Sequence, residues 1–271
     1  MSQKRLIRKN IVNFCFENEK SKHHNSPVKI IKCGMKKGLV ALISNLVIVT
    51  VLVVSFSVAY LAADKTREVN VASKAIYQGD ETKGKVALMF NVYERTDNVE
   101  KIMAIFEEYG YLTTFFVGGC WVAKNADAVV KMHTAGFEVG NHGYLHRDHA
   151  KLNYDENVKE IRLTGRLVST ILKDFDDFDR LTLFAPPSGS IGEPMMKAAE
   201  DLGYKVIMWT RDTIDWRDQD ADLIFTRATD NLKAGELILL HPTDATVQAL
   251  PRILDYVKIV GLQADIVSNV I

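Results

Sequence analysis

The chain has 271 residues, of which 47% are hydrophobic and 25% are charged, a composition typical of one globular domain with an appended segment. The 34 basic and 34 acidic residues cancel, which excludes the strong positive field typical of nucleic-acid-binding proteins, so we expect no nucleic-acid partner. Three cysteines exclude a fold held by several disulfides, and a hydrophobic core therefore has to hold the domain together.

The beginning of the chain predicts a membrane anchor. Residues 1–37 contain ten Lys and Arg residues against two Glu, and an uncharged apolar run, residues 38–63, follows them. As a helix this run would be ~39 Å long, enough to cross a hydrocarbon core of ~30 Å. A cleaved signal peptide is the alternative, but its apolar region usually has only about 7–15 residues. Because the positive charges precede the span, we predict a cytoplasmic tail at 1–37, a single transmembrane signal anchor at 38–63 and an extracytoplasmic remainder.

The rest of the chain predicts a polar linker followed by one domain. Residues 64–83 are polar and lack periodicity, so the domain would occupy residues 84–271. Apolar runs alternate there with amphipathic stretches, which predicts an α/β fold, and seven strand candidates favour a closed or nearly closed barrel. The strand candidates are residues 85–90, 112–117, 137–139, 181–184, 205–209, 237–240 and 264–267. The helix candidates are residues 98–109, 127–135, 154–172, 193–202, 220–232 and 249–260.

Two histidines follow the third strand candidate. His142 and His146 are four residues apart, a spacing that places two side chains on one face of a helical turn, about 5–6 Å apart at Cβ. Two neutral imidazoles can share one divalent metal ion, most often zinc. A pair of solvated surface histidines is the alternative interpretation.

Polar or conformationally special residues also follow the other strand candidates. In a barrel the carboxyl ends of the strands meet at one rim, where functional groups collect, so these clusters predict one site. They are Asn91-Val92-Tyr93-Glu94, Gly118-Gly119, Asn141-His142, Ala185-Pro186-Pro187-Ser188-Gly189, Asp212 with Asp215-Trp216, and His241-Pro242.

The order of these fragments resembles the polysaccharide deacetylases, carbohydrate esterase family four, from about Lys85 to the C-terminus. The segment 184–189 is similar to the family's Arg-x-Pro-x-Gly segment, and Asp215-Trp216 and residues 239–242 are similar to its fourth and fifth motifs. The resemblance implies a distorted (β/α) barrel that removes N-acetyl groups from a cell-wall amino-sugar polymer, either peptidoglycan or a chitin-like glycan. It also implies a divalent metal, zinc before cobalt or manganese.

The resemblance further implies a role for individual residues. His142 and His146 would be metal ligands, and His241 would be the general acid, with Asp215 orienting its imidazole. The backbone N–H of Ser188 would help hold the oxyanion. The other residues of the substrate-binding wall would be Pro187, Trp216, Leu239 and Tyr93.

The chain departs from the family at two places. Where the family has Thr-Phe-Asp-Asp-Gly, with a general base and then a metal ligand, this chain has Met89-Phe90-Asn91-Val92-Tyr93. Aligned without a gap, Asn91 replaces the base and Val92 the ligand; aligned with a gap of one residue, Asn91 becomes the ligand, as in some sporulation-type members. The second departure is Ala185, in place of the Arg that pairs with the base. Losing both partners together is physically coherent, because an unpaired buried Arg is costly.

We assign Asn91 as the third metal ligand and keep three hypotheses for the site. Another carboxylate could act as the base, with Glu94, Asp148 and Asp212 as candidates. His241 could act with bound hydroxide alone, or the domain could bind glycan without turnover. A structural partner in an envelope complex is a further class, supported only by the anchor. We expect His149 to lie on the surface.

Overall fold

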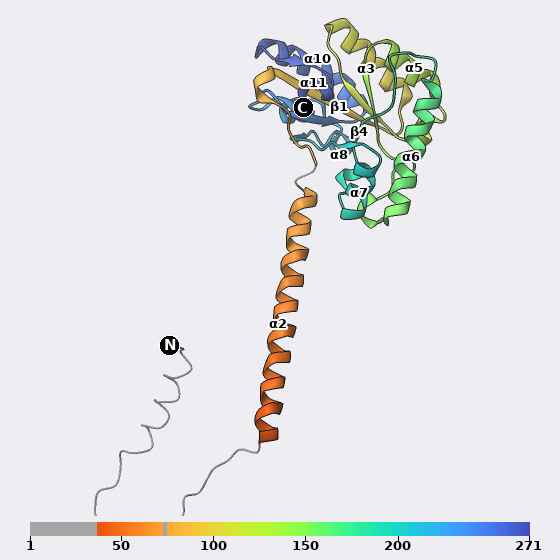
Figure 1. Cartoon of the computed structure of the whole chain (residues 1–271). Helices are drawn as coiled ribbons and strands as arrows, with labels where there is room; N and C mark the ends of the chain where they lie inside the picture. Colours follow the sequence, from red (N-terminus) through yellow and green to blue (C-terminus); the bar gives the residue numbers. More distant parts are fainter. Residues whose placement is uncertain (1–36, 73–74) are drawn as a thin grey trace, which may run out of the picture. The chain divides into compact units, whose positions relative to one another are not determined.

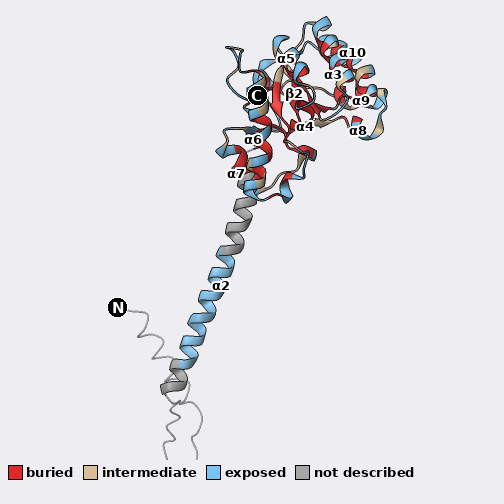
Figure 2. Ribbon diagram, turned by 90° about the vertical axis from the view of Figure 1, so that its right-hand side faces the viewer, coloured by how far each residue is buried: buried red, intermediate tan, exposed pale blue. Residues whose placement is uncertain are grey.

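The computed structural model describes residues 37–72 and 75–271, so nearly all of the predicted cytoplasmic tail, residues 1–36, lies outside the described residues. Helix α2 (Lys37–Ala72) contains the predicted span. Within it, residues Leu42–Ala59 have a mean hydropathy of 2.4 and none of this window is buried, as Figure 2 shows. By length and composition α2 is a candidate membrane span, although a signal sequence passes the same test.

The domain is built on a parallel sheet in the order β5-β4-β3-β2-β1-β7-β6, with β8 paired to β1. This curled, incomplete barrel confirms the predicted α/β class and the distorted barrel of about seven strands. The strands are β1 (Lys85–Val92), β2 (Thr114–Val117), β3 (Glu138–Asn141), β4 (Leu183–Phe184), β5 (Lys205–Val206), β6 (Arg211–Asp212), β7 (Leu237–Leu240) and β8 (Gln263–Ala264).

The helices cover the outer face of this sheet, and Figure 1 shows α3, α5 and α10 beside it. The longer helices are α3 (Thr96–Tyr109), α5 (Ala126–Thr134), α6 (Tyr154–Ile171), α7 (Glu193–Asp201), α9 (Ala221–Thr229) and α10 (Asp244–Ile259). The short ones are α4 (Gly119–Val122), α8 (Asp215–Asp218) and α11 (Val267–Val270), with 3₁₀ turns η1 (Glu81–Lys83), η2 (His149–Lys151) and η3 (Pro187–Gly189).

The two faces of β1 explain why its sequence does not alternate between polar and apolar residues. Phe90 and Val92 belong to the core beneath the helices, whereas Met89 points into the barrel interior with residues from β2 and β7. Both faces are therefore buried, as in other parallel strands. Because side chains alternate along a strand, Asn91 continues the interior face and Val92 does not.

Strand β6 was not predicted, and it changes the position of Asp212. The extended segment that starts at β5 runs from β4 to β7. At its start Lys205 N–H bonds Thr182 O, beside β4, at 2.8 Å, and further along Thr210 N–H bonds Leu237 O of β7 at 2.9 Å. Asp212 pairs in register with Leu239 of β7. Only the first two residues of the predicted strand 205–209 form β5, and Asp212 lies in a strand rather than in a loop.

The predicted linker at 64–83 differs from the structure. Helix α2 continues to Ala72, and residues 75–83 pack into the domain. Ile76 N–H bonds Val206 O and Ile76 O accepts Met208 N–H, both at 2.8 Å, so this segment lies against the extended chain after β5. The prediction was wrong here because a buried Ala75 and a half-buried Ile76 in an otherwise polar stretch give no periodic signal.

Candidate active site

A cavity of about 570 Å³ opens where the strands of the barrel end. All the predicted site residues line it except Asp215 and Pro187, which are buried behind its wall. The predicted residues on its wall are Asn91, Tyr93, His142, His146, Ser188, Trp216, Leu239 and His241. The wall residues that belong to none of the predicted rim clusters and were not predicted site residues are Arg95, Trp209, Gln219 and Thr243.

The two predicted histidine ligands lie together, but not on a helix. The ring centroids of His142 and His146 are 5.2 Å apart with the planes inclined at 69°. The segment between them is an irregular loop in which Gly143 has φ 71° and His146 has φ 53°. The prediction of a helical turn was therefore wrong, and left-handed residues rather than helical periodicity bring the rings together.

His142 has the geometry of a metal ligand. Its side chain is almost fully buried, and Nδ1 lies 2.7 Å from the carbonyl oxygen of Ala185. A carbonyl can only accept, so Nδ1 carries the hydrogen and the lone pair of Nε2 remains free. Burial, with the nearby His146 adding to it, lowers the pKa of His142 to about 3, so the ring is neutral at pH 7. A hydrogen-bonded neutral imidazole is the usual form of a ligating histidine.

Asn91 contributes an unpaired acceptor to the same cavity. The residue is 5% exposed, and its Oδ1 is buried without a hydrogen-bond partner. Leaving such an atom unpaired costs about 1–3 kcal/mol. In the described part of the chain no three His, Cys, Asp or Glu side chains gather as a metal site, so a cation held by the two imidazoles would take its third protein ligand from an amide oxygen such as this one. Two nitrogens and one oxygen fit a borderline divalent cation such as zinc.

His241 is held at the opposite rim by a buried carboxylate. Its Nδ1–H donates to Asp215 Oδ1 at 2.8 Å, and its backbone N–H donates to Oδ2 at 2.6 Å. Asp215 is fully buried and accepts two further bonds, from Trp216 N–H at 2.9 Å and Thr246 Oγ1–H at 2.7 Å. Four donors fix the carboxylate, which in turn fixes the tautomer of His241 and leaves its Nε2 available at the cavity.

The backbone around this cavity is strained. Four non-glycine residues on its wall have positive φ, a conformation that is uncommon for side chains with a Cβ atom. Such strain persists only where the surrounding structure imposes it, and it concentrates at functional sites. The four residues are Arg95, His146, Ser188 and Gln219.

Ser188 and Pro187 play different structural parts in the turn η3. Ser188 has φ 56° and is exposed at the cavity, whereas Pro187 is buried and does not reach the wall. The following Gly189 has φ 63°, and a Cβ there would lie 2.6 Å from the ring of Trp209. The predicted wall residue Pro187 therefore supports the turn rather than lining the cavity.

Only two of the three candidate bases lie at the cavity. Glu94 and Asp212 line it. Asp148 does not: its carboxylate bonds Ser190 and, at 2.8 Å, Lys151, and these bonds lower its pKa. A carboxylate held outside the cavity cannot deprotonate water inside it, so Asp148 was wrongly included.

Helix α6 holds the histidine loop through side chains that the sequence did not identify. The buried Glu160 accepts the backbone N–H groups of Tyr144 at 2.9 Å and Leu145 at 2.7 Å. His149 is fully buried, contrary to the expected surface position, and its Nδ1 lies 2.7 Å from Asn157 Oδ1. Polar residues on an amphipathic helix usually face solvent, so only the fold reveals these contacts.

We predict that Glu160→Gln lowers the free energy of unfolding by about 1–3 kcal/mol, because two charge-assisted hydrogen bonds weaken and a buried amide NH₂ lacks a partner. Urea denaturation of the full chain in detergent measures this change. Asp155→Asn, in the exposed first turn of the same helix, is the control and should change it by less than about 0.5 kcal/mol. Equal effects of the two substitutions would contradict a special role for Glu160.

Comparisons with known proteins point to one family. The family profile for polysaccharide deacetylase matches residues 78–207. YlxY of Bacillus subtilis is 32% identical over 199 residues, which cover 72% of this chain and 59% of that protein. A peptidoglycan-N-acetylglucosamine deacetylase of Bacillus cereus is 30% identical over 190 residues, covering 68% of this chain and 67% of that enzyme.

A solved structure shows the same similarity. BA3943 of Bacillus anthracis, described as a CE4 family pseudoenzyme, aligns with a TM-score of 0.68 and 31% identity, covering 72% of this chain and 68% of that chain. A mutant of BA3943 is described as having restored enzymatic activity.

Proposed function

Because the chain belongs to the polysaccharide deacetylase family, carbohydrate esterase family four, we propose that its cavity hydrolyses N-acetyl groups of a cell-wall amino-sugar polymer. Peptidoglycan is the first candidate substrate, because the Bacillus cereus relative is a peptidoglycan deacetylase, and a chitin-like glycan is the second. The observation that carries the proposal is the pairing of His241 with the buried Asp215 on the wall that also holds His142 and His146.

The metal site of this proposal consists of Asn91, His142 and His146. A divalent cation bound there would polarise the acetyl carbonyl and lower the pKa of a water molecule. Zinc is favoured by the two imidazoles, with cobalt or manganese as alternatives. The unpaired Oδ1 of Asn91 and the free Nε2 of His142 support this assignment.

His241 is the proposed general acid. With Nδ1–H bonded to Asp215, protonated His241 can donate its Nε2–H to the amine nitrogen as the C–N bond breaks. The Asp215 carboxylate, whose Oδ1 lies 2.8 Å from Nδ1, would stabilise the imidazolium. The backbone N–H of Ser188 is the proposed oxyanion donor, and Trp216, Leu239 and Tyr93 are proposed to bound the acetyl and sugar subsites.

The general base is the open step, because the amide of Asn91 cannot accept a proton from water. If Glu94 or Asp212 is the base, replacing that residue by its amide, Glu94→Gln or Asp212→Asn, is predicted to lower acetate release by about 10²–10⁴-fold. This is the usual contribution of general base catalysis. Initial rates of acetate release by the metal-loaded chain measure this. Asp148→Asn, whose carboxylate lies outside the cavity, is the matched control and should be near wild type. Unchanged rates in all three variants would support hydrolysis without a carboxylate base.

A second candidate function is glycan binding without turnover. In the alignment without a gap, Asn91 and Ala185 stand where the family has its base and the Arg that pairs with it, and BA3943, with a similar structure, is described as a pseudoenzyme. A domain of this kind would keep the cavity and its rim residues. It would bind amino-sugar chains and release no acetate.

One experiment separates these two functions. The full chain, purified in a neutral detergent, is loaded with zinc, cobalt or manganese and incubated with N-acetylated peptidoglycan and with chitooligosaccharides. Acetate release that is lost in His142→Ala supports a metal-dependent deacetylase. Glycan binding without acetate release under any metal supports the binding module and contradicts the enzyme.

We also propose that α2 anchors the domain in the membrane with the N-terminus in the cytoplasm. The apolar, unburied window 42–59 and the preceding basic residues support this orientation. Protease added to intact cells should digest the domain while leaving an N-terminal tag protected. Protection of both ends would contradict the orientation.

A further inference from the structure

A second cavity, of about 530 Å³, lies beside helix α6 and shares no residue with the first. Its charged lining residues are all cations: Arg162, Arg166, Lys173 and Arg180. No Asp or Glu lines it. A concave surface with charges of one sign raises the local concentration of ions of the opposite sign.

The sequence of α6 places two of these cations in one stripe. Arg162 and Arg166 are four residues apart, and Ser169 continues the same face. No acidic residue occurs three or four positions before or after either arginine. Like charges at this spacing destabilise a helix by about 0.2–0.5 kcal/mol. The stripe therefore carries a small cost that a bound anion would remove.

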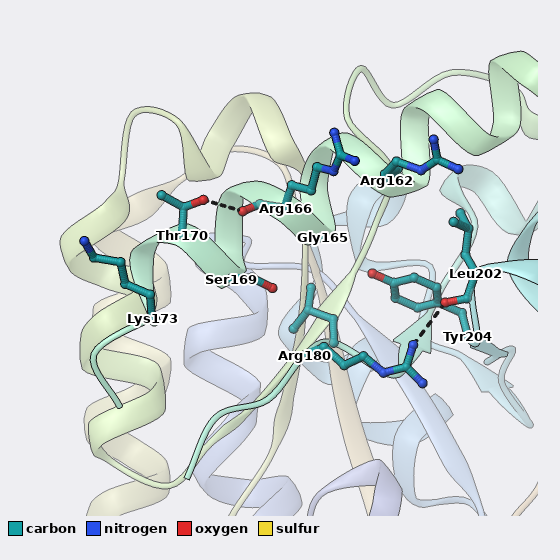
Figure 3. A pocket seen from close by; sticks show the side chains of 10 residues that line it. Arg162, Gly165, Arg166, Ser169, Thr170, Lys173, Arg180, Leu202 and Tyr204 are labelled. Carbon is teal, nitrogen blue, oxygen red and sulfur yellow. Dashed lines mark hydrogen bonds between the residues drawn. The ribbon is translucent and has the colours of Figure 1, made fainter. Parts of the chain in front are cut away.

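Three of these four cations have no acidic partner among the described residues. Across residues 75–271, no carboxylate forms an ion pair with Arg162, Arg166 or Lys173, although arginines and lysines on other helices do pair, such as Lys197 with Asp201. Figure 3 shows the two arginines on α6 and Arg180 on the other side of the Tyr204 ring. The charges are therefore available to a ligand.

Arg180 and Tyr204 form an ordered wall opposite α6. Arg180 Nη1–H donates to the carbonyl of Leu202 at 3.3 Å, and its guanidinium lies so close to Gly203 that a Cβ there would be 2.8 Å from Nη1. The hydroxyl of Tyr204 accepts Asn141 Nδ2–H at 3.2 Å, which holds its ring in place. Arg180 is thus fixed at the edge of the cavity with N–H groups to spare.

We propose that this cavity binds a phosphorylated sugar, with the phosphate at the arginines and the ring against Tyr204 and Leu202. Guanidinium groups form paired hydrogen bonds with phosphate oxygens. A carboxylate has one negative charge and two oxygens, so four cations suit a phosphate better than a carboxylate. The volume is in the range of small-molecule sites and far exceeds one phosphate ion, so the ligand carries a larger body. The apolar side chains of Leu181 and Leu202 suit the faces of a sugar ring.

The test is a calorimetric titration of the full chain in neutral detergent with N-acetylglucosamine 1-phosphate. Inorganic phosphate and unphosphorylated N-acetylglucosamine are titrated in parallel. Saturable binding of the sugar phosphate is expected, weaker binding of inorganic phosphate, and affinity that falls as salt rises. Arg166→Gln should weaken binding about tenfold, and Arg162→Gln with Arg166→Gln about a hundredfold.

Lys159→Gln is the matched control, because Lys159 is an exposed cation of the same helix that does not line the cavity. It should change the affinity by less than about twofold. Equal losses of affinity in Lys159→Gln and Arg166→Gln would show that binding depends only on the general surface charge, and this would contradict the proposed site. Absence of saturable sugar phosphate binding would also overturn it, as would binding only to vesicles that contain phosphatidylglycerol, which would indicate a membrane surface instead.

Discussion

Asn91→Asp is expected to raise acetate release by the zinc-loaded chain at least tenfold. The residue lies at the end of β1 on the cavity wall with His142 and His146, and in the alignment without a gap it takes the place of the family's base, where a carboxylate can accept the proton that an amide cannot. General base catalysis contributes about 10²–10⁴-fold, but Ala185 offers no arginine to hold the new carboxylate, so we expect the lower end. Initial rates on N-acetylated peptidoglycan measure the change.

Asn91→Ala is the control for this prediction. It removes the unpaired buried Oδ1, so it should leave the metal-free chain as stable as wild type or more stable, while weakening zinc binding and giving no gain in rate. A rate for Asn91→Asp no higher than that of Asn91→Ala, with zinc still bound, would show that position 91 is not where the base acts.

The neighbouring position should behave differently. Val92 is fully buried in the core beneath the helices, so Val92→Asp places a charge among apolar side chains rather than in the cavity. An unpaired buried charge costs several kcal/mol, and we expect unfolding instead of activation. A folded and active Val92→Asp chain would favour the alignment in which residue 92 is the metal ligand.

The second large effect is expected at His241. His241→Ala should lower acetate release by about 10²–10⁴-fold, because no other imidazole on the wall is held by a buried carboxylate in the described domain. Asp215→Asn should lower it comparably, since an amide NH₂ facing Nδ1 favours the wrong tautomer of His241. Rates and thermal unfolding are measured together to separate catalysis from folding.

Asp218→Asn is the control for the Asp215 substitution. Asp218 lies on the same short helix but pairs with Arg217 and Arg227 outside the cavity, so its loss should leave the rate within about twofold. Full activity of His241→Ala would contradict its role as the acid. If the domain only binds glycan, neither substitution changes acetate release, and the affinity for chitooligosaccharides remains measurable in both.

Several features of the fold were predictable because they depend on local patterns. Strand β7 was predicted with its observed bounds, because an apolar run without alternation indicates a strand covered on both faces. Helix α6 begins at a capping box formed by Asn153 and Glu156, and its apolar face repeats with the helical period. The residues after each strand were then expected at one rim, and nine of them line the cavity.

Other features depend on contacts between residues far apart in the sequence. Strand β6 forms only because the chain after β5 crosses from β4 to β7. The strand has two residues, and a segment this short gives no pattern that predicts its pairing. His149 is buried because Phe184 and Asn157 surround it. Asp148 is excluded from the cavity because Ser190 and Lys151 hold it elsewhere. In each case the deciding partner is supplied by another element.

The sequence by itself determined the chemistry at the rim: which side chains follow the strands, that the usual Asp-Asp pair and its Arg partner are absent, and that an apolar helix precedes the domain. Only the tertiary structure showed to which side each residue at the end of β1 points, because strand alternation turns Asn91 towards the cavity and buries Val92 beneath the helices. It also decided that α6 holds the histidine loop with Glu160 on one side and presents two arginines to the second cavity on another. Whether a side chain is buried, and which group it bonds, depends on the elements that pack against it. The sequence predicts these properties only where the neighbouring groups belong to the same helix or strand.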